Sequence, residues 1–456
     1  MNLKDKQVLV VGAGRSGLAA VKRLKAMGAR VKLTDRQEPD KLKGVHEVGL
    51  TGGQLILGRT PEWDEVQSEI IVLSPGVSPA LPFIQVGISQ GAQIWSEVEL
   101  ALRDHPAFKI GVTGTNGKTT TTTLIGELAK ITGRPTLVAG NIGVALSDQV
   151  GELNEQGIVV AELSSFQLEH IDSLRMNVGI LLNMTPDHLD RHGTIDNYLA
   201  AKARIFEYQR AEDCAILNWD DTRVRELAPH LKGRVIFISP TTFLENGYSV
   251  QGDELVFAEN GKLTPIMNRC ELQLRGNHNL ENILASIAAV RELGLSWEQI
   301  GQGLREFKGV EHRQEVVGTY DGILFINDSK GTNPDAAEKA LYAFTEPIVL
   351  IAGGKNKGLD FHDFMKIVKE QVKSLVLVGA AADEMEIAAQ DVGIQHYLRA
   401  ETFEEAVELA IAEAKPGDVV LLSPACTSWD MFKSYEERGE FFKELVRRHY
   451  REPILK

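Results

Sequence analysis

A glycine-rich turn contains the residue types that a nucleotide-binding loop requires. Residues 114–120 read Gly-Thr-Asn-Gly-Lys-Thr-Thr and follow the apolar run 109–112. At a strand-to-helix junction, backbone amides, the Lys118 ammonium and the Thr119 hydroxyl would converge on a triphosphate and magnesium. The strict G-x-x-x-x-G-K-[ST] pattern is missed, because Val112 occupies the place of its first glycine. We expect the turn to bind ATP; a glycine-rich turn without a ligand is the alternative.

Side chains that suit a magnesium ion follow two later apolar runs. The run 158–161 ends at Glu162, and the run 178–182 is followed by Thr-Pro-Asp-His-Leu-Asp-Arg-His-Gly at 185–193. Magnesium in phosphoryl-transfer sites is held by oxygen donors on strand ends and loops. We expect these residues to be functional. A carboxylate that only ends a strand, and a loop that is polar because it is solvated, are the alternatives.

A second glycine-rich turn lies near the N-terminus. Residues 12–17 satisfy G-x-G-x-x-G between a predicted strand at 7–11 and a predicted helix near 18–27, and Asp35 follows the next strand. Such glycines let backbone amides approach a diphosphate at a helix N-terminus, and any nucleotide diphosphate can use that geometry. A dehydrogenase site, a uridine-diphosphate site and a tight turn without a ligand therefore all remain open.

The elements that must position these residues repeat along the chain. Three times an apolar run ends in a glycine-rich or polar turn and a helical pattern, which predicts βα units on largely parallel sheets. The third block starts at 323–326 and continues through predicted strands at 348–352, 375–378 and 419–422. We predict three α/β domains, at 1–107, 108–307 and 308–456. The first and last are Rossmann-like, and the central one resembles a P-loop ATPase.

Composition narrows the class of protein. The chain has 456 residues, 43% of them hydrophobic and 25% charged, with a net charge of −14. These proportions are typical of soluble globular proteins, and the acidic balance argues against binding nucleic acid or an anionic membrane. Three scattered cysteines suggest neither a disulfide framework nor a zinc site. With no predicted signal peptide or membrane span, we expect a cytoplasmic protein, most simply a monomer.

Several motifs together resemble those of one enzyme family. They are residues 114–120, Glu-Leu-Ser-Ser-Phe-Gln-Leu at 162–168, Asp-His-Leu-Asp-Arg-His at 187–192, Gly-Asn-His-Asn at 276–279 with Asn282, and His312-Arg313. They are similar to the Mur ligase family, three-domain enzymes that form amide bonds in peptidoglycan precursors. Residues 327–334 and 423–432 look most like those of members that add D-glutamate to UDP-N-acetylmuramoyl-L-alanine. The match runs from Gly12 to the end of the chain.

The resemblance implies a ligand for each domain and argues against NAD as the ligand of the first turn. The UDP-linked substrate would contact Arg15, Ser16, Asp35, Arg36, Gly76, Asn141, Ser164, Gln167 and His188. ATP would contact Gly114, Thr115, Asn116, Gly117, Lys118, Thr119, Thr120, Asn279, Asn282, Arg313, Asp328 and Lys330. D-Glutamate would contact Thr332, Lys357, Ser428, Trp429 and Tyr435. Ordinary polar surface is the alternative for Asn279, Asn282, Arg313, Asp328 and Lys330. A flexible exposed loop is the alternative for residues 353–358, which carry Lys357.

The resemblance also implies a mechanism. The γ-phosphoryl group of ATP would convert the L-alanyl carboxylate to an acyl phosphate, which the D-glutamate amine then attacks. The catalytic residues would be Lys118, Glu162, His188, Lys202 and Arg313, and Mg²⁺ would be held by Thr119, Glu162, His188 and Lys202. Lys202 would act as a carbamate, because carbamylation turns a cation into an oxygen ligand. From the sequence alone, a solvated lysine on a helix is the usual interpretation.

Other functions remain as alternatives. A sister ligase that adds a different amino acid or a dipeptide would share the ATP site, but no Asp-Asn-Pro-Arg motif occurs in the chain. A folylpolyglutamate synthetase-like enzyme would share the central domain, although the extra N-terminal nucleotide-type domain counts against it. A P-loop ATPase without ligase chemistry is the alternative from another class. The preferred function predicts a role in cytoplasmic peptidoglycan synthesis, and so in cell-wall growth, cell shape and division.

Overall fold

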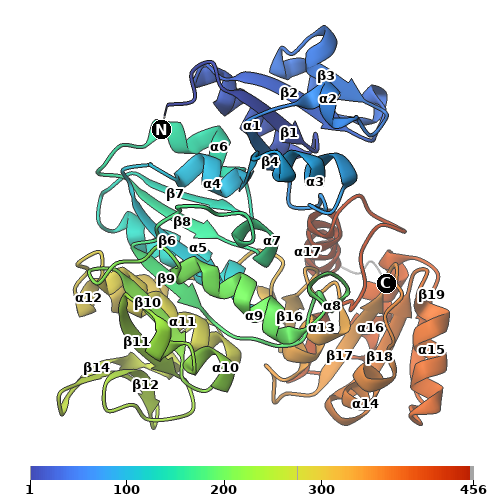
Figure 1. The fold of residues 1–456 in the computed structure, drawn as a ribbon. Helices are drawn as coiled ribbons and strands as arrows, with labels where there is room; N and C mark the ends of the chain where they lie inside the picture. Colours follow the sequence, from blue (N-terminus) through green and yellow to red (C-terminus); the bar gives the residue numbers. More distant parts are fainter. Residues whose placement is uncertain (1, 275, 452–456) are drawn as a thin grey trace. The chain divides into compact units, whose positions relative to one another are not determined.

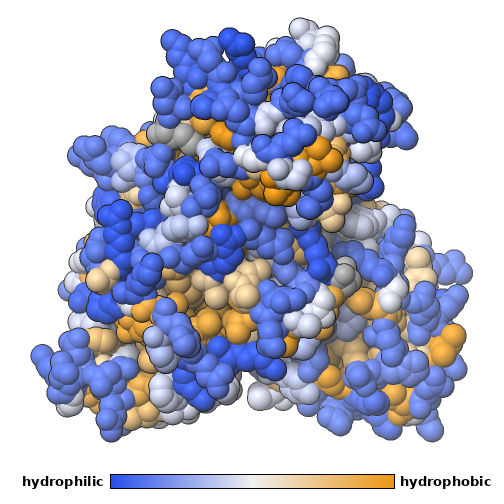
Figure 2. Space-filling view, in the orientation of Figure 1, coloured by the Kyte–Doolittle hydropathy of each residue, from blue (hydrophilic) through white to orange (hydrophobic). Residues whose placement is uncertain are grey.

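A computed structural model describes residues 2–274 and 276–451, which form three α/β domains, each built on its own sheet (Figure 1). The domains lie in two compact units, Met1–Glu271 with Leu280–Glu306, and Leu272–Asn279 with Phe307–Lys456. The boundaries near residues 107 and 308 stay predictions. On the face drawn in Figure 2, hydrophilic residues predominate and apolar ones form small groups. Within residues 2–274 and 276–451, we find no helix with the length and apolar character needed to cross a membrane.

The first sheet is wholly parallel, with strand order β3-β2-β1-β4-β5. Its core lies on both faces, because Val8 and Val10 of β1 belong to one buried cluster while Leu9 and Val11 belong to another. This two-sided burial explains why the strand reads as a continuous apolar run. The elements are β1 (Gln7–Val11), α1 (Arg15–Ala26), β2 (Arg30–Asp35), β3 (Leu55–Leu57), α2 (Trp63–Val66), β4 (Ile70–Leu73), α3 (Pro82–Ser89), β5 (Gln93–Ser96) and α4 (Glu97–Leu102).

The second sheet has the order β14-β13-β12-β11-β10-β9-β6-β8-β7. It is parallel from β7 to β12, and β13 and β14 add an antiparallel edge that the sequence patterns did not predict. The elements are β6 (Phe108–Thr113), α5 (Lys118–Lys130), β7 (Thr136–Gly140), α6 (Leu146–Gln149), β8 (Ile158–Glu162), α7 (Ser165–Leu168), β9 (Val178–Leu181), α8 (Leu189–His192), α9 (Ile195–Ala203), β10 (Cys214–Asn218), α10 (Thr222–Arg225), β11 (Arg234–Ser239), β12 (Gly247–Gln251), β13 (Glu254–Glu259), β14 (Lys262–Asn268), α11 (Asn277–Arg291) and α12 (Trp297–Glu306).

The third sheet has the order β15-β16-β20-β17-β18-β19, with only β15 antiparallel to its neighbour among the described strands. Because β20 lies between β16 and β17, the loops that follow these three strands share one edge of the sheet. The elements are β15 (Glu315–Tyr320), β16 (Ile323–Asn327), α13 (Pro334–Leu341), β17 (Ile348–Gly353), α14 (His362–Gln371), β18 (Val372–Val378), α15 (Ala382–Asp391), β19 (Tyr397–Ala400), α16 (Phe403–Glu413), β20 (Val419–Leu422) and α17 (Tyr435–Arg451).

The predicted strands are confirmed to within a few residues, and α1 begins three residues earlier than predicted. Its start is set by the glycine-rich turn, where Gly14 occupies the N-cap position with extended backbone. Gly17 lies against the preceding strand end, and a Cβ atom added to it would approach the carbonyl oxygen of Gly12 to 1.8 Å. The last glycine of the motif is therefore required for close packing of the helix on the turn.

Gly17→Ala is expected to destabilise the first unit by about 3 kcal/mol, because a backbone carbonyl cannot yield as a flexible side chain can. The melting temperature should fall by roughly 6–12 °C. Gly14→Ala is the matched control in the same turn, since no described atom lies within 4 Å of the added Cβ and φ is −73°. Differential scanning calorimetry of both variants checks this, and equal losses in the two would contradict the packing argument.

Candidate active site

The glycine-rich loop at 114–117 joins β6 to α5 at the carboxyl edge of the second sheet. Gly114 and Gly117 have φ values of +149° and +81°, a region that favours glycine. A Cβ atom on Gly117 would lie 2.1 Å from Oδ1 of Asn282. The same Oδ1 accepts a hydrogen bond from the Thr121 hydroxyl at 3.2 Å. The structure therefore brings the predicted residue Asn282, on α11, directly against the loop.

Asn183, two residues after the end of β9, fixes the loop in place. Its side-chain oxygen accepts from the Asn116 amide at 2.8 Å, and its side-chain nitrogen donates to Glu281 on α11 at 2.7 Å. The Thr115 amide also donates to the Asn183 carbonyl at 3.0 Å. Sequence reasoning missed this residue. The available signal was an asparagine immediately after the apolar run 178–182, which becomes informative once β9 is known to neighbour β6.

Lys118 and Lys202 meet at one carbonyl group. The Lys118 ammonium donates to the carbonyls of Gly114 and Thr115 at 2.9 and 2.8 Å, and the Lys202 ammonium donates to Gly114 at 2.8 Å. Lys202 is 1% exposed, so it is not a solvated lysine. Burial, and secondly the nearby Lys118 charge, lower the pKa of Lys202 well below its usual value. Two amino groups therefore lie at the base of the nucleotide loop.

Glu162 ends β8 beside these lysines. Its Oε1 accepts from the Asn141 side chain at 2.8 Å, whereas its buried Oε2 has no hydrogen-bond partner among the described residues. A buried, unpartnered carboxylate oxygen fits a metal ligand. Thr119, which is also predicted to hold the metal, is buried as well. Among the described residues, no group of three or more His, Cys, Asp or Glu side chains forms a metal site. The predicted metal-ligand set, which combines Glu162 with Thr119, His188 and Lys202, therefore stays a prediction.

His188 lies on the turn before α8 with a φ of +52°. Its side chain is 49% exposed, and its ring meets Phe166 edge-on at 5.1 Å between centroids. It also faces Tyr198 edge-on at 6.3 Å, and the Lys202 ammonium lies 4.5 Å from the centroid of that Tyr ring. The side chain of Asp190, the second acid predicted here, lies outside the described part. The structure thus connects His188 to Lys202 through one aromatic ring.

Two of the residues predicted to hold a UDP group form hydrogen bonds at or near the first glycine-rich turn. Asp35 accepts from the Ala13 amide at 2.7 Å, which fixes the first glycine-rich turn, and the Arg15 guanidinium donates to the Gly143 carbonyl at 2.9 Å. Arg15 thereby connects the turn to the loop that holds Asn141. Ser16 is half-buried, whereas Arg36 and Gly76 are exposed.

Ser164 and Gln167 form reciprocal hydrogen bonds at the start of α7. The Gln167 amide donates to the Ser164 hydroxyl at 3.3 Å, and the Ser164 amide donates to Oε1 of Gln167 at 2.9 Å. This reciprocal pair is a capping box, which supplies a structural reason for both residues. Contact of either residue with the UDP-linked substrate remains a prediction.

The second unit holds the remaining residues predicted for ATP. One of them, Asn279, lies near the start of α11, three residues before Asn282. Arg313 lies between His312 and Gln314, whose φ values are +62° and +45°. Both strained neighbours are held in place: the Lys330 amide donates to the His312 carbonyl at 2.9 Å, and the Gln314 amide donates to Asp328 at 3.2 Å. Asp328 and Lys330 thus fix the turn that carries Arg313. The side chains of Asn277 and His278, in the 276–279 motif, lie outside the described part.

Asp328→Asn is expected to change how stability depends on pH. Burial raises the pKa of Asp328 to about 6, opposed first by a hydrogen bond from Ser423. The folded state therefore binds the proton more tightly than the unfolded state, so this contribution is complete below about pH 4 and is lost as the pH rises through 6. As the pH rises from 4 to 8, the free energy of unfolding of the variant should increase by about 3 kcal/mol relative to that of wild type. Urea unfolding of both proteins measures this difference, and a pH-independent difference would contradict it.

The residues predicted to contact D-glutamate lie on the loops after β16, β17 and β20, with Tyr435 at the start of α17. Backbone bonds between Lys355 and Thr427, at 2.8 and 3.1 Å, pair two of these loops. The Lys357 ammonium lies 5.2 Å from the Trp429 ring centroid on these paired loops. The Lys330 ammonium lies 5.6 Å from the ring centroid of Tyr435. Ser428 is buried, and its hydroxyl has no partner among the described residues. Thr332 is half-buried on the first loop.

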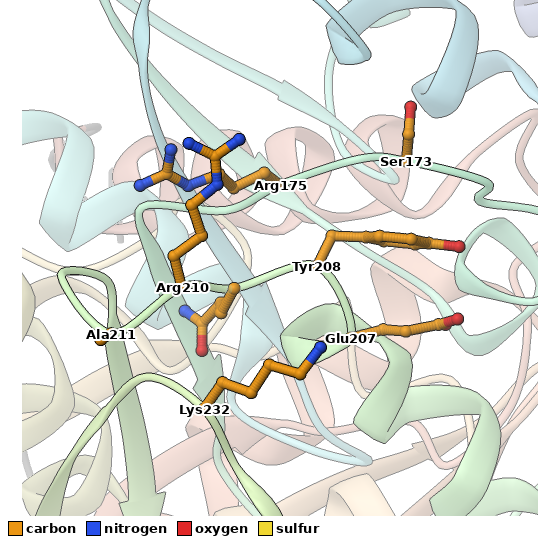
Figure 3. A pocket seen from close by; sticks show the side chains of 8 residues that line it. Ser173, Arg175, Glu207, Tyr208, Arg210, Ala211 and Lys232 are labelled. Atoms are coloured by element: carbon orange, nitrogen blue, oxygen red, sulfur yellow. The ribbon is translucent and has the colours of Figure 1, made fainter.

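A separate depression of about 730 Å³ is lined by residues that precede β9, β10 and β11, at the opposite edge of the second sheet. Figure 3 shows the guanidinium groups of Arg175 and Arg210 side by side there, with Lys232 reaching in from below. Arg175 is neutralised by Asp213 and Glu212, each at 2.7 Å. The depression contains none of the predicted site residues.

Three family models match the chain in order. They are a Mur ligase MurD-like N-terminal domain at residues 6–96, a Mur ligase middle domain at 112–290 and a Mur ligase glutamate ligase domain at 312–426. Among solved structures, the chain is similar to a UDP-N-acetylmuramate-alanine ligase from Thermotoga maritima. That likeness has a TM-score of 0.60, 20% identity, and covers 97% of this chain and 100% of the other. At that identity it supports the fold alone.

Curated relatives are much more similar in sequence. A protein of Desulfitobacterium hafniense (strain DSM 10664 / DCB-2), named UDP-N-acetylmuramoylalanine–D-glutamate ligase, is 83% identical over 454 residues and covers 100% of both chains. A protein of Pelotomaculum thermopropionicum with the same name is 49% identical, over 97% of this chain and 98% of its own. Similarity of this extent spans every loop described above.

Proposed function

The chain belongs to the Mur ligase family, and from that premise we propose that it joins D-glutamate to UDP-N-acetylmuramoyl-L-alanine in an ATP-dependent reaction. The observation that carries the proposal is 83% identity, over the whole chain, to a protein named for that activity. The chain is an amide-bond ligase of peptidoglycan precursor synthesis, and it releases ADP and phosphate. The N-terminal turn accordingly receives a uridine nucleotide rather than NAD.

The first step activates a poor acyl donor. An oxygen of the L-alanyl carboxylate attacks the γ-phosphorus of ATP, the bond to the β-phosphate oxygen breaks, and an acyl phosphate and ADP result. Lys118 is well placed for this chemistry, because its ammonium already lies at the carbonyls of the glycine-rich loop and can turn to a phosphate oxygen. A fixed cation at developing phosphate charge lowers the barrier.

The second step forms the amide. The neutral amine of D-glutamate attacks the acyl carbon, the phosphate leaves, and the amine loses its proton. Lys357 and Trp429 would hold the amino acid, because an ammonium beside an aromatic ring can pair with a side-chain carboxylate. The unpartnered Ser428 hydroxyl offers a further donor, and Thr332 and Tyr435 complete the proposed pocket.

When bound, Mg²⁺ would supply positive charge to neutralise the phosphate oxygens in this chemistry. We propose that Thr119, Glu162, His188 and a modified Lys202 hold it. The unpartnered Oε2 of Glu162 supports this assignment on the protein side. Asn282 and Asn183 contact the nucleotide loop and hold its backbone in place.

Carbamylation of Lys202 is the modification we propose. A buried lysine whose pKa is lowered presents a neutral amine, and a neutral amine can add CO₂ with loss of a proton. The Lys202 and Lys118 side-chain nitrogens both donate to the Gly114 carbonyl, so a carbamate on Lys202 would place a negative charge beside the Lys118 ammonium, where a second ammonium would be repelled. The resulting oxygens suit magnesium.

The deciding assay supplies UDP-N-acetylmuramoyl-L-alanine, ATP and Mg²⁺, with and without D-glutamate. We expect phosphate release that requires D-glutamate and a product heavier by one glutamyl residue in mass spectrometry. If L-lysine or a dipeptide serves better, the chain is a sister ligase. If phosphate release is indifferent to any amino acid, it is an ATPase without ligase chemistry. We place the reaction in the cytoplasm and expect a monomer, which sedimentation would test.

A further inference from the structure

The ring of Phe166, in α7, supports the whole turn that carries His188. The guanidinium carbon of Arg191 lies 4.1 Å from the ring centroid, and the His192 ring stacks on it at 5.3 Å with an interplanar angle of 3°. His188 meets the same ring edge-on at 5.1 Å. Three side chains of one short segment therefore pack on one aromatic ring.

A carboxylate fixes the far side of this turn. Glu169 accepts from the Arg191 guanidinium at 3.4 Å and lies 3.2 Å from Nδ1 of His192. The other ring nitrogen of His192 is 3.0 Å from the Ser165 hydroxyl, and its side chain is 3% exposed. Burial raises the pKa of Glu169, and the Arg191 charge opposes this shift. Arg191 and His192 are thus held by both the ring and the carboxylate.

Arg191 also reaches the N-terminal domain. Its Nη1 donates to the Pro75 carbonyl at 3.1 Å, and Pro75 directly precedes Gly76 on the loop after β4. One guanidinium group therefore contacts a carbonyl of the first domain, the face of Phe166 and the carboxylate of Glu169. A planar group with several fixed donors is suited to such a three-way contact, and a lysine is not.

The backbone at His188 makes this support necessary. A non-glycine residue at positive φ is strained and persists only where its surroundings hold it. The His188 amide donates to its neighbour Asp187 at 2.9 Å, a bond within the same turn. Among the contacts described, Arg191 is the one that joins this turn to the loop at 74–77, where the UDP-linked substrate is proposed to bind.

We propose that Arg191 is a positioning residue that couples the loop at 74–77 to the orientation of His188. It acts through the Pro75 carbonyl and the Phe166 ring and touches no reacting atom. Binding of the UDP-linked substrate at the first loop would then hold the histidine where the acyl end arrives. The kinetic part of this inference rests on the proposed function, whereas the coupling itself does not.

The kinetic test compares Arg191→Met with Arg103→Met. Arg103 is a matched control: its guanidinium also lies over an aromatic ring, 4.9 Å from the Trp95 centroid, and pairs with Asp172 at 2.7 Å. Its exposed fraction is 23% against 25% for Arg191. Arg191→Met should lower kcat about tenfold and raise KM for the UDP-linked substrate several-fold, with KM for ATP and D-glutamate within twofold of wild type. Equal kcat in the two variants would overturn the proposal.

Hydrogen–deuterium exchange of the same variants, without substrates, tests the coupling alone. Arg191→Met should accelerate amide exchange several-fold in both segments, 74–77 and 186–193, while Arg103→Met leaves them unchanged. Unchanged exchange in either segment of Arg191→Met, or an increase spread evenly through the first unit, would overturn the inference. If wild type shows no D-glutamate-dependent turnover, the proposed function fails while this measurement still decides the coupling.

Discussion

Lys202→Ala is expected to reduce kcat by about 10³-fold, equivalent to about 4 kcal/mol of transition-state stabilisation. The side chain is buried at the nucleotide loop, where its ammonium donates to Gly114. Truncation removes the proposed carbamate and its ligand oxygens, and it leaves a cavity large enough for a small carboxylate. Added acetate or propionate should therefore restore part of the activity, as steady-state phosphate release will show.

Lys109→Ala is the matched control for this variant. Lys109 is another buried lysine of the same domain, whose ammonium donates to the His105 carbonyl at 2.7 Å. It should lose stability but keep kcat within about twofold, because it lies at the start of β6, at the edge opposite the nucleotide loop. If Lys202→Ala matches this control in kcat, Lys202 has no catalytic role.

The carbamate has a test of its own. Wild-type protein equilibrated with ¹³C-bicarbonate should show a protected carbamate carbon signal in NMR, and Lys202→Ala should lack it. Removal of CO₂ should lower activity, and restored bicarbonate should recover it. A wild-type spectrum without that signal in fully active protein would show that Lys202 acts unmodified.

Lys118→Ala is expected to lower kcat by about 10²–10³-fold, because one fixed cation at the transferring phosphate is worth about 3–4 kcal/mol. Lys118 begins α5 directly after the loop, so its ammonium needs no rearrangement of backbone to reach a phosphate oxygen. Lys118→Arg should recover little, since a planar guanidinium is too large for the place of the ammonium. Single-turnover measurement of acyl-phosphate formation separates this loss from a loss of ATP affinity.

Lys130→Ala controls for a change of charge on the same helix. Lys130 lies at the other end of α5, is 57% exposed and pairs with Glu127. Exposed pairs of this kind contribute little to stability, so activity and melting temperature should both stay close to wild type. A comparable loss of kcat in Lys130→Ala would show that the effect of Lys118 reflects net charge rather than position.

The three α/β blocks and their glycine-rich turns could be predicted from sequence patterns alone. Strands such as β1 and β17 are buried on both faces, so they appear in the sequence as unbroken apolar runs. Glycine is required at Gly17 by close packing and at Gly117 by a positive φ, so the turns carry glycines at fixed spacings. The local motifs at 114–120 and 187–192 likewise indicated the family. Each of these signals lies within a short segment of the sequence, so it can be recognised without knowing the fold.

Which polar residues contact one another across the fold, and which bond only to close neighbours in sequence, could be seen only in the folded chain. Lys202 looks like a solvated helical lysine in sequence, and only the packing of α9 against the loop buries it beside Lys118. Asn183 acquires its role because β9 neighbours β6, a pairing of segments distant along the chain. Ser164 and Gln167 show the converse, since their capping box satisfies them locally. Such partnerships depend on non-local contacts, which no spacing within one segment encodes.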